Sequence, residues 1–421
     1  MPEPAARRQQ QHRSPGGDDG HRPGRPIPPP AEPAPGRGGQ VSEAAERLVT
    51  ALRHRLGRPV PPEWTAALRA TPRDVFLPGT VWLRDGEGGY ERCDRATDAG
   101  RWRAAASADE PVVTRLDTEP DGWQRPVSSL SAPSTVVRML DTLALRDGDR
   151  VLEIGTGVGF TAALLAHRLG DGQVISLELD ADLVRTARGN LAFLGRRPAV
   201  ECADGARGWP DGGPYDAVFA TCSVRGVPGA WLEQTRPGGR IVVPWATAWC
   251  AFGTVTLTRR DDGGADGRFT SGGSSMPLLD RTAHGPGPER VDEPPRVSRT
   301  GLSPWAVAGE DYTAQFAVGA CVPGVRHVWD GAPAPKGVRV RLWLDDEAGG
   351  SWATVDVRDG SVGFVVAQYG PRSLWDEAET AWHWWDHHGR PTPDRFGISA
   401  TRDAHTLWLD TPATPCLRPS S

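Results

Sequence analysis

Apolar residues spaced three or four positions apart predict helices in the first patterned part of the chain. One such run lies between residues 44 and 56, where Leu48 and Leu52 share a face, and a second covers residues 64–70. A further helix is predicted over residues 131–143, because proline is favoured in a first helical turn and Pro133 stands there.

From residue 150 the pattern changes to short apolar strands that alternate with helical segments. The predicted strands cover residues 150–155, 173–179, 199–202, 215–221 and 240–245, and the helices cover residues 161–169, 182–195 and 230–235. This alternation predicts an α/β fold with a doubly wound, mainly parallel sheet. Valine and threonine alternate before a glycine-rich turn at residues 253–270, so we expect the sheet to end in an antiparallel hairpin.

Composition divides the chain into parts. Residues 1–40 are rich in polar and turn-forming residues and are predicted to be a disordered arm, followed by a first domain over residues 41–282. Proline, glycine and charged residues mark residues 283–300 as a linker. Residues 301–421 combine alternating strands with a helix and a last strand at residues 405–410, which predicts a C-terminal α+β accessory domain.

Charge and cysteine content limit the partners that we expect. The formal net charge is −5, so the chain has no surplus of positive charge for a phosphate backbone, and no nucleic-acid partner is predicted. The six cysteines include no C-x-x-C pair, which argues against a disulfide framework and a thiolate metal site. No run of about eighteen apolar residues occurs, so we expect no membrane span and a cytoplasmic location.

A glycine-rich turn follows the strand at residues 150–155 and leads into a helix, which is where open α/β sheets bind cofactors. Phe160 stands where a dinucleotide-binding G-x-G-x-x-G motif has its third glycine. S-adenosyl-L-methionine suits the turn better than NAD, because it has no pyrophosphate and carries an ammonium group that an acidic neighbour can hold. The residues of this segment that we assign to the cofactor are Glu153, Gly155, Thr156, Gly157 and Gly159.

Two later strand ends complete the expected cofactor site. Glu178 ends the second strand, where a carboxylate can accept hydrogen bonds from both ribose hydroxyls. Asp204 and Gly205 follow the third strand and are assigned to the adenine end of the cofactor. A lone G-x-G-x-G turn is also a common strand-to-helix connection, so the assignment depends on these pieces occurring together.

Over about residues 64–258 the sequence resembles the protein-L-isoaspartate O-methyltransferases. The shared motifs are PR-x-x-F-x-P at residues 72–78, the S-x-P helix start at residues 131–133 and DG-x-x-GWP at residues 204–210. The resemblance implies a Rossmann-like class I methyltransferase fold for the first domain. It also implies transfer of a methyl group from S-adenosyl-L-methionine to a carboxylate of aspartate or isoaspartate in a peptide or protein. A carboxylate is ionised at neutral pH, so this reaction needs no strong base.

The resemblance further implies a catalytic role for one serine. Ser131 matches the serine that the family places beside the transferable methyl, and we expect it to position the acceptor. Its neighbours Ser128 and Ser129 are assigned to the cofactor site. The alternative, that these serines cap the following helix, stays open.

The sequence also departs from the isoaspartate repair enzymes. Residues 125–131 replace their Gly-Gln-Thr-Ile-Ser run, the connection between residues 79 and 124 is longer, and their minimal form has no C-terminal domain. The ending from Arg395 to Asp410 resembles a branch that acts on ribosomally synthesised, post-translationally modified peptides. Enzymes of that branch esterify one Asp of a macrocyclic precursor, and the ester collapses to aspartimide and then isoaspartate.

We therefore expect esterification of an aspartate in a modified, macrocyclic peptide. Repair of isoaspartate in damaged proteins is the alternative, because the shared motifs are those of the repair family. A non-catalytic peptide-binding module that retains the cofactor pocket is a second alternative.

A tryptophan-rich segment occupies a predicted helix near the C-terminus. It contains Trp375, Trp382, Trp384 and Trp385 beside His383, His387 and His388. Such aromatic side chains can grip a peptide, but packing into the small core of their own domain is favoured. No metal site is expected at His387 and His388, because adjacent helical residues point in different directions.

Overall fold

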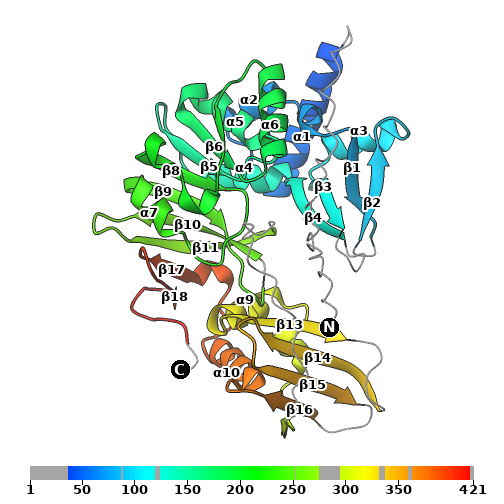
Figure 1. The fold of residues 1–421 in the computed structure, drawn as a ribbon, viewed down its shortest axis with the longest axis vertical. Helices are drawn as coiled ribbons and strands as arrows, with labels where there is room; N and C mark the ends of the chain where they lie inside the picture. The colour runs from blue at the N-terminus through cyan, green and yellow to red at the C-terminus, as the bar shows by residue number, and fades with distance from the viewer. Residues whose placement is uncertain are drawn as a thin grey trace, which may run out of the picture.

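The computed structural model describes residues 37–86, 89–118, 124–250, 252–274, 294–330, 337–358 and 363–417 (Figure 1). The predicted arm at residues 1–40 lies outside these ranges except at its end, where α1 (Arg37–Leu56) begins. Among the described helices, none combines the length and the apolar character needed to cross a bilayer.

The largest sheet begins parallel at one edge and becomes antiparallel toward the other. Its strands, in spatial order, are β7 (Ala199–Cys202), β6 (Val174–Glu178), β5 (Val151–Ile154), β8 (Tyr215–Ala220), β9 (Thr235–Pro244), β10 (Phe252–Arg259), β11 (Ala265–Ser274), β17 (Phe396–Ala400) and β18 (His405–Leu409). Pairing is parallel from β7 to β9 and antiparallel from β9 to β18. The predicted α/β fold and the predicted antiparallel hairpin are confirmed.

Alternate side chains of these strands enter two cores on opposite faces of the sheet, as the pleat of a strand requires. Val151 faces one core and Leu152 the other, and Phe219 and Val218 of β8 divide in the same way. The first core contains buried residues of α1, α2 (Pro62–Ala70), α4 (Pro133–Thr142), α5 (Phe160–Leu169) and α6 (Ala181–Phe193). The second contains residues of α7 (Gly229–Gln234) and of the C-terminal region. Helices therefore cover both faces, as the doubly wound prediction requires.

A smaller antiparallel sheet precedes α4 and lies beside the N-terminal helices (Figure 1). In spatial order its strands are β2 (Tyr90–Asp94), β1 (Thr80–Arg84), β3 (Val112–Thr118) and β4 (Gln124–Leu130). The helix α3 (Ala99–Ser107) lies between β2 and β3 in the chain, and the 3-10 turn η1 (Arg73–Phe76) precedes β1. This sheet accounts for the long connection between residues 79 and 124, and β4 leads directly to Ser131.

The C-terminal region builds a third sheet. In spatial order its antiparallel strands are β12 (Arg296–Thr300), β16 (Phe364–Tyr369), β15 (Trp352–Arg358), β14 (Val338–Asp346) and β13 (Val325–Asp330). Its helices are α8 (Pro304–Ala308), α9 (Tyr312–Cys321) and α10 (Leu374–His387). Trp375 and Trp385 of α10 are 1% and 2% exposed, so core packing of these two tryptophans is confirmed.

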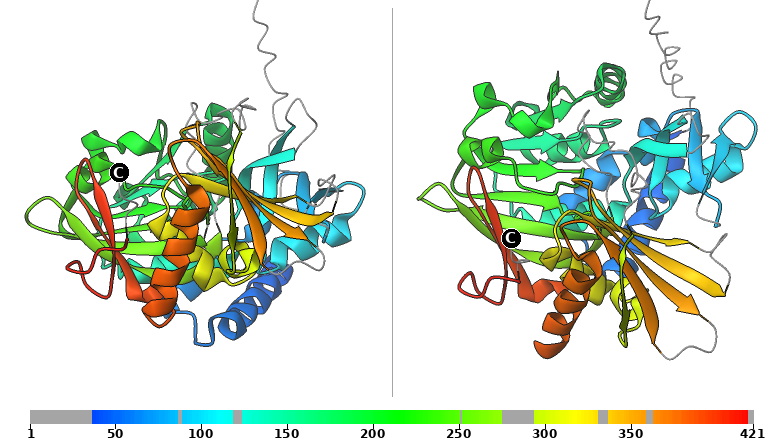
Figure 2. Two further views of the ribbon diagram at one scale, coloured as in Figure 1. Left: turned by 90° about the horizontal axis from the view of Figure 1, so that it is seen from below. Right: turned by 60° about the horizontal axis from the view of Figure 1, so that its bottom comes forward.

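The predicted division at residues 283–300 does not separate two independent cores. The end of the predicted linker is β12, which pairs with β16 of the third sheet. The last strands, β17 and β18, leave the accessory region and extend the main sheet through β11 (Figures 1 and 2). Phe316 of α9 packs edge to face on Phe269 of β11 and on Phe396 of β17, with ring centroids 5.2 and 5.3 Å apart. The accessory region and the main sheet therefore share one hydrophobic core.

The shared core predicts that Phe316→Ala lowers the stability of both regions together. Removal of a buried phenylalanine side chain costs about 3–5 kcal/mol, and Phe316 is 5% exposed. Calorimetry should show one transition in the parent, and in the variant a lower Tm. Phe193→Ala is the matched control, because Phe193 is 38% exposed and its loss should change the free energy of unfolding by less than about 1 kcal/mol. Two separate transitions in the parent would contradict the shared core.

Candidate functional site

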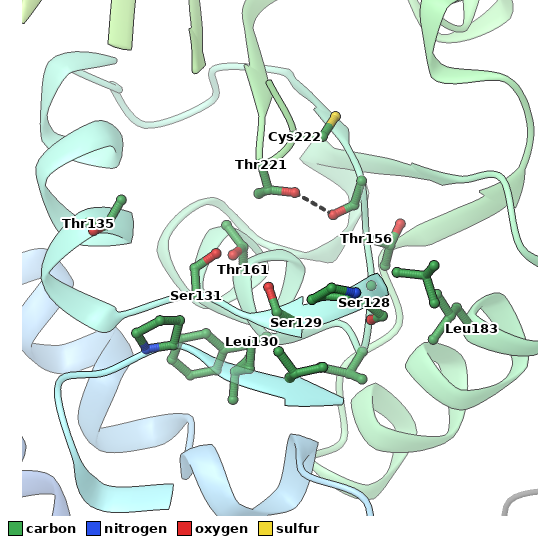
Figure 3. A pocket seen from close by; sticks show the side chains of 18 of the residues that line it. Ser128, Ser129, Leu130, Ser131, Thr135, Thr156, Thr161, Leu183, Thr221 and Cys222 are labelled. Carbon is green, nitrogen blue, oxygen red and sulfur yellow. Dashed lines mark hydrogen bonds between the residues drawn. The ribbon is translucent and has the colours of Figure 1, made fainter. Parts of the chain in front are cut away.

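A cavity of about 670 Å³ lies at the carboxyl ends of β5, β6, β7 and β8, and its opposite wall is formed by β4 and the start of α4 (Figure 3). This volume is in the range of about 300–1,000 Å³ that is typical of cofactor and small-molecule sites. Its position at the carboxyl edge of the parallel strands is the usual ligand site of an open α/β sheet.

Most of the predicted site residues line this cavity. They are Ser128, Ser129, Ser131, Gly155, Thr156, Gly157, Glu178, Asp204 and Gly205. Glu153 and Gly159 are not among the lining residues. The structure therefore brings together the segments before α4, after β5, and at the ends of β6 and β7.

The glycine turn after β5 is held from both neighbouring strands. Gly155 has a φ of +89°, and a Cβ there would lie 2.7 Å from Oγ1 of Thr221. Thr221 Oγ1 donates a hydrogen bond of 2.6 Å to the Gly155 carbonyl, as Figure 3 shows. On the other side the Gly157 N–H, at a φ of +55°, donates to Glu178 Oε2 at 2.8 Å. Only glycine combines this backbone conformation with such a close approach.

Glu178 presents an oriented carboxylate to the cavity. Its Oε1 accepts a hydrogen bond of 3.1 Å from the Asp180 N–H, while Oε2 is held by Gly157. Burial raises the pKa of Glu178, and these backbone donors oppose that rise. Each carboxylate oxygen can accept more than one hydrogen bond, so Glu178 keeps the capacity to accept from a ligand hydroxyl.

Glu153 does not reach the cavity, so its predicted contact with the cofactor ammonium is not supported by its position. Its side chain is fully buried, and Oε2 accepts a 2.6 Å hydrogen bond from Ser176, which in turn lies 2.6 Å from Thr156 Oγ1. Burial raises the pKa of Glu153 to about 8, which leaves the group neutral at pH 7. Through Ser176 and Thr156, Glu153 therefore stabilises the glycine turn from its buried side.

Gly159 allows two helices to pack closely against each other. It precedes α5 with a φ of +96°, and a Cβ there would lie 3.2 Å from the Cβ of Ala187 on α6. The glycine therefore permits α5 and α6 to approach closely. It does not line the cavity.

Asp204 and Gly205 lie together at the cavity edge that follows β7. Asp204 Oδ1 accepts a hydrogen bond of 3.0 Å from the Ala206 N–H, which fixes the turn. A Cβ at Gly205 would lie 2.5 Å from Cγ2 of Ile154, so only glycine fits beside β5.

The serines on the opposite wall do not cap α4, so the capping alternative is wrong. The residue before the helix is Ala132, and the Ser134 N–H donates instead to Asp109 Oδ1 at 2.8 Å. Ser128 is 3% exposed and its hydroxyl accepts from Thr114 Oγ1 at 2.8 Å. Ser131 lines the cavity between β4 and α4.

Arg73, from the PR-x-x-F-x-P motif, holds this wall in place, and we assigned it no role from the sequence. Its guanidinium is buried and donates to the carbonyls of Ala105, Ala108, Glu110, Leu130 and Ser131 at 2.6–3.4 Å. Burial lowers the pKa of Arg73 to about 10, opposed by the nearby Asp109 and Glu110, so the group stays charged. The clamp joins the segment after α3 to the end of β4 and so fixes the backbone at Ser131.

The same motif contacts the cofactor wall. Phe76 packs edge to face on Phe160, the first residue of α5, with ring centroids 5.5 Å apart. One short 3-10 turn therefore links both walls of the cavity.

Thr221 and Cys222, which follow β8, also line the cavity and were not predicted as site residues. Burial raises the pKa of the Cys222 thiol to about 12, so the thiol stays protonated and is a poor nucleophile. Among the described residues no group of three or more His, Cys, Asp and Glu side chains is placed to hold a metal ion.

The strand order, the glycine turn after β5 and the acidic residue at the end of β6 define a Rossmann-like class I methyltransferase. Comparison with known proteins names the family. A family model described as protein-L-isoaspartate(D-aspartate) O-methyltransferase matches residues 117–272. The chain belongs to the protein-L-isoaspartate O-methyltransferase family.

Curated relatives show how far the similarity extends. An enzyme of Methylorubrum extorquens (strain PA1), named protein-L-isoaspartate O-methyltransferase, is 36% identical over 250 residues, which cover 59% of this chain and 90% of the relative. A relative of the same name from Pyrococcus horikoshii is 33% identical over 180 residues, which cover 42% of this chain and 77% of the relative. A solved protein-L-isoaspartate O-methyltransferase structure is 20% identical, has a TM-score of 0.49, and covers 87% of this chain and 100% of its own.

Family membership confirms that the chain is a methyltransferase and that its cofactor is S-adenosyl-L-methionine. The comparisons support the family but do not distinguish the branch that acts on modified peptides, so that assignment stays a prediction.

The buried carboxyl group of Glu153 predicts a stability that falls as pH rises. Its pKa is about 8 in the folded chain and about 4.3 when unfolded, so the folded state binds the extra proton between these values. The folded state therefore loses stability, of the order of a few kcal/mol, as pH rises from about 4.5 to 8.

Glu153→Gln removes this titration, so the Tm of the variant relative to the parent should increase from pH 5 to about pH 8 and level off above that pH. Melting curves without cofactor measure the difference. Glu201→Gln on β7 makes the same chemical change at a carboxylate whose side chain is 37% exposed, and it serves as control. A Glu153→Gln difference that does not change with pH would contradict a neutral Glu153.

The clamp predicts a specific defect in Arg73→Lys. Lysine keeps the charge but lacks the planar fork of donors, so it cannot hold both chain segments. We expect kcat to fall at least about tenfold while the dissociation constant of S-adenosyl-L-methionine stays within about twofold, because the glycine turn is untouched. Arg69→Lys, at an exposed ion pair with Glu46, is the control. Equal losses in cofactor affinity and kcat would indicate general unfolding instead of lost positioning.

Proposed function

We propose that this chain methylates the carboxylate of an isoaspartate or aspartate residue in a polypeptide, with S-adenosyl-L-methionine as the methyl donor. The observation that carries the proposal is one cavity with two different walls. One wall has the glycine turn and Glu178, and the other has Ser131 on a backbone held by Arg73.

The residues of the first wall fit the cofactor. The turn at Gly155 and Gly157 leaves no Cβ between backbone and ligand, and Glu178 offers oxygens that can accept from the ribose hydroxyls. Asp204 and Gly205 would adjoin the adenine. When bound, the cofactor supplies an electrophilic methyl group on a sulfonium.

The second wall would receive the acceptor. The carboxylate oxygen of the substrate forms the new C–O bond as the sulfonium C–S bond breaks, with its electron pair left on sulfur, which yields a methyl ester and S-adenosyl-L-homocysteine. Because an ionised carboxylate needs no base, the chain has mainly to orient the acceptor and exclude water. The Ser131 hydroxyl can donate a hydrogen bond to the acceptor and align it.

The comparisons favour isoaspartate in proteins as the substrate, since the named relatives are protein-L-isoaspartate O-methyltransferases. Esterification of aspartate in a macrocyclic peptide is the second candidate. It is favoured by the segments that lie beyond the similarity, which covers 59% of the chain in the Methylorubrum relative. The accessory region and its tail are the largest addition, and they share a core with the main sheet.

Two synthetic peptides separate these candidates. A linear peptide with isoaspartate and a macrocyclic peptide with aspartate are each incubated with the protein and S-adenosyl-L-methionine, and products are measured by mass spectrometry. Methylation of the linear isoaspartyl peptide supports repair. A methyl ester, or loss of water through aspartimide, on the cyclic peptide alone supports peptide modification. Cofactor binding without methylation of any peptide would contradict both and indicate a binding module.

Ser131 and Glu178 should show opposite defects. Ser131→Ala is expected to lower kcat while the affinity for S-adenosyl-L-methionine stays close to that of the parent, because Ser131 faces the acceptor. Glu178→Ala should weaken cofactor binding by about 1–3 kcal/mol through lost hydrogen bonds. Isothermal calorimetry and initial rates measure both. A Glu178→Ala variant with parental affinity would show that the cofactor lies elsewhere.

A further inference from the structure

Among the described residues that line the cavity, the arginines lie on one wall. Arg55 of α1, Arg84 of β1, Arg125 of β4 and Arg138 of α4 all line it, and we call them the arginine rim. They come from the part of the chain before β5, whereas Glu178 and Asp204 lie on the cofactor wall. The acceptor side of the cavity therefore carries guanidinium groups, and the cofactor side carries carboxylates.

Acidic residues on the acceptor wall do not neutralise the rim. Asp109 and Glu110 also line the cavity, but both lie near the buried Arg73, and Asp109 caps α4. Within the described ranges, neither Arg55 nor Arg138 has a carboxylate at ion-pair distance. Arg84 lies over the ring of Tyr90, 5.6 Å from its centroid, and Tyr90 lines the same cavity.

Within the rim, Arg138 lies at a defined distance from the expected acceptor. Arg138 stands on α4, six residues after Ala132, so at a rise of about 1.5 Å per residue it lies roughly 9 Å along the helix from the Ser131 segment. An extended peptide covers about 3.3–3.6 Å per residue. A side chain about three residues from the acceptor can therefore reach Arg138.

We propose that the arginine rim is a binding subsite for a carboxylate of the peptide substrate, about three residues from the methylated residue. The inference rests on the proposed function, which supplies the polypeptide acceptor, and it narrows the substrate to acidic segments. Arg55 and Arg138, which have no carboxylate at ion-pair distance among the described residues, line the cavity and can attract a carboxylate and hold it through charge-assisted hydrogen bonds.

The test compares peptides that differ at one position. Fluorescent isoaspartyl peptides carry Glu, Gln or Lys three residues before or after the acceptor, and their affinities for the protein are measured by anisotropy with S-adenosyl-L-homocysteine present. We expect one of the Glu peptides to bind about three- to tenfold more tightly than its Gln counterpart at low salt. This advantage should shrink in about 0.5 M salt, because screening weakens exposed ion pairs.

Variants connect the preference to the rim. Arg138→Gln with Arg55→Gln should abolish the difference between Glu and Gln peptides, and Arg138→Glu should favour the Lys peptide. Arg146→Gln is the control, since Arg146 is exposed just beyond α4 and does not line the cavity. It should keep the preference for Glu.

Equal affinities of all peptides for the parent, or no binding of any, would overturn the inference, as would a Glu preference that survives the double substitution. Initial rates of methylation are recorded separately. A Glu preference in binding without methylation would leave the subsite standing and refute the proposed function instead.

Discussion

A charged guanidinium buried from water is the constraint on which the site depends. Burial of such a group without hydrogen-bond partners is costly, so the chain around Arg73 must bring carbonyl oxygens to it. It does so from two segments, the stretch after α3 and the end of β4, whose carbonyls at Ala108 and Ser131 accept at 2.7 and 3.2 Å. The small antiparallel sheet and the start of α4 are thereby fixed relative to one another. Because Phe76 of the same turn packs on Phe160, the position of the acceptor wall is coupled to that of the cofactor wall.

The cofactor wall is held by hydrogen bonds to the backbone of the glycine turn. Gly155 and Gly157 have no side chains, so their backbone groups are attached through Thr221 just after β8 and Glu178 on β6. Both attachments lie at the carboxyl ends of the strands that neighbour β5 in the parallel part of the sheet. The buried network of Glu153, Ser176 and Thr156 supports the turn from within the sheet. Order in this wall therefore precedes cofactor binding, which reduces the entropy that binding must overcome.

Sequence patterns predict the local parts of this structure well. The strands and helices from β5 to β9 follow apolar periodicity, and the cavity residues from Gly155 to Gly205 follow from their places at strand ends. Features that depend on distant contacts were not predictable in this way. Glu153 has the residue type of a cofactor ligand, but the pleat of β5 turns it into the core. The joining of β17 to β11 requires pairing across more than a hundred residues, and the role of Arg73 depends on carbonyls that no side-chain pattern reveals.

The additions to the common fold act on the site in different ways. The small sheet contributes Arg84 and Arg125 to the cavity wall, so it can change which peptide binds without altering the cofactor turn. The accessory region reaches the same edge of the main sheet, since Glu347, between β14 and β15, pairs with Arg225 in the loop after β8. That loop follows Thr221 and Cys222, which line the cavity. Because the accessory region also shares the core of the main sheet, it is a fixed part of the enzyme, and its contact beside β8 connects it to the segment that lines the cavity at Thr221 and Cys222.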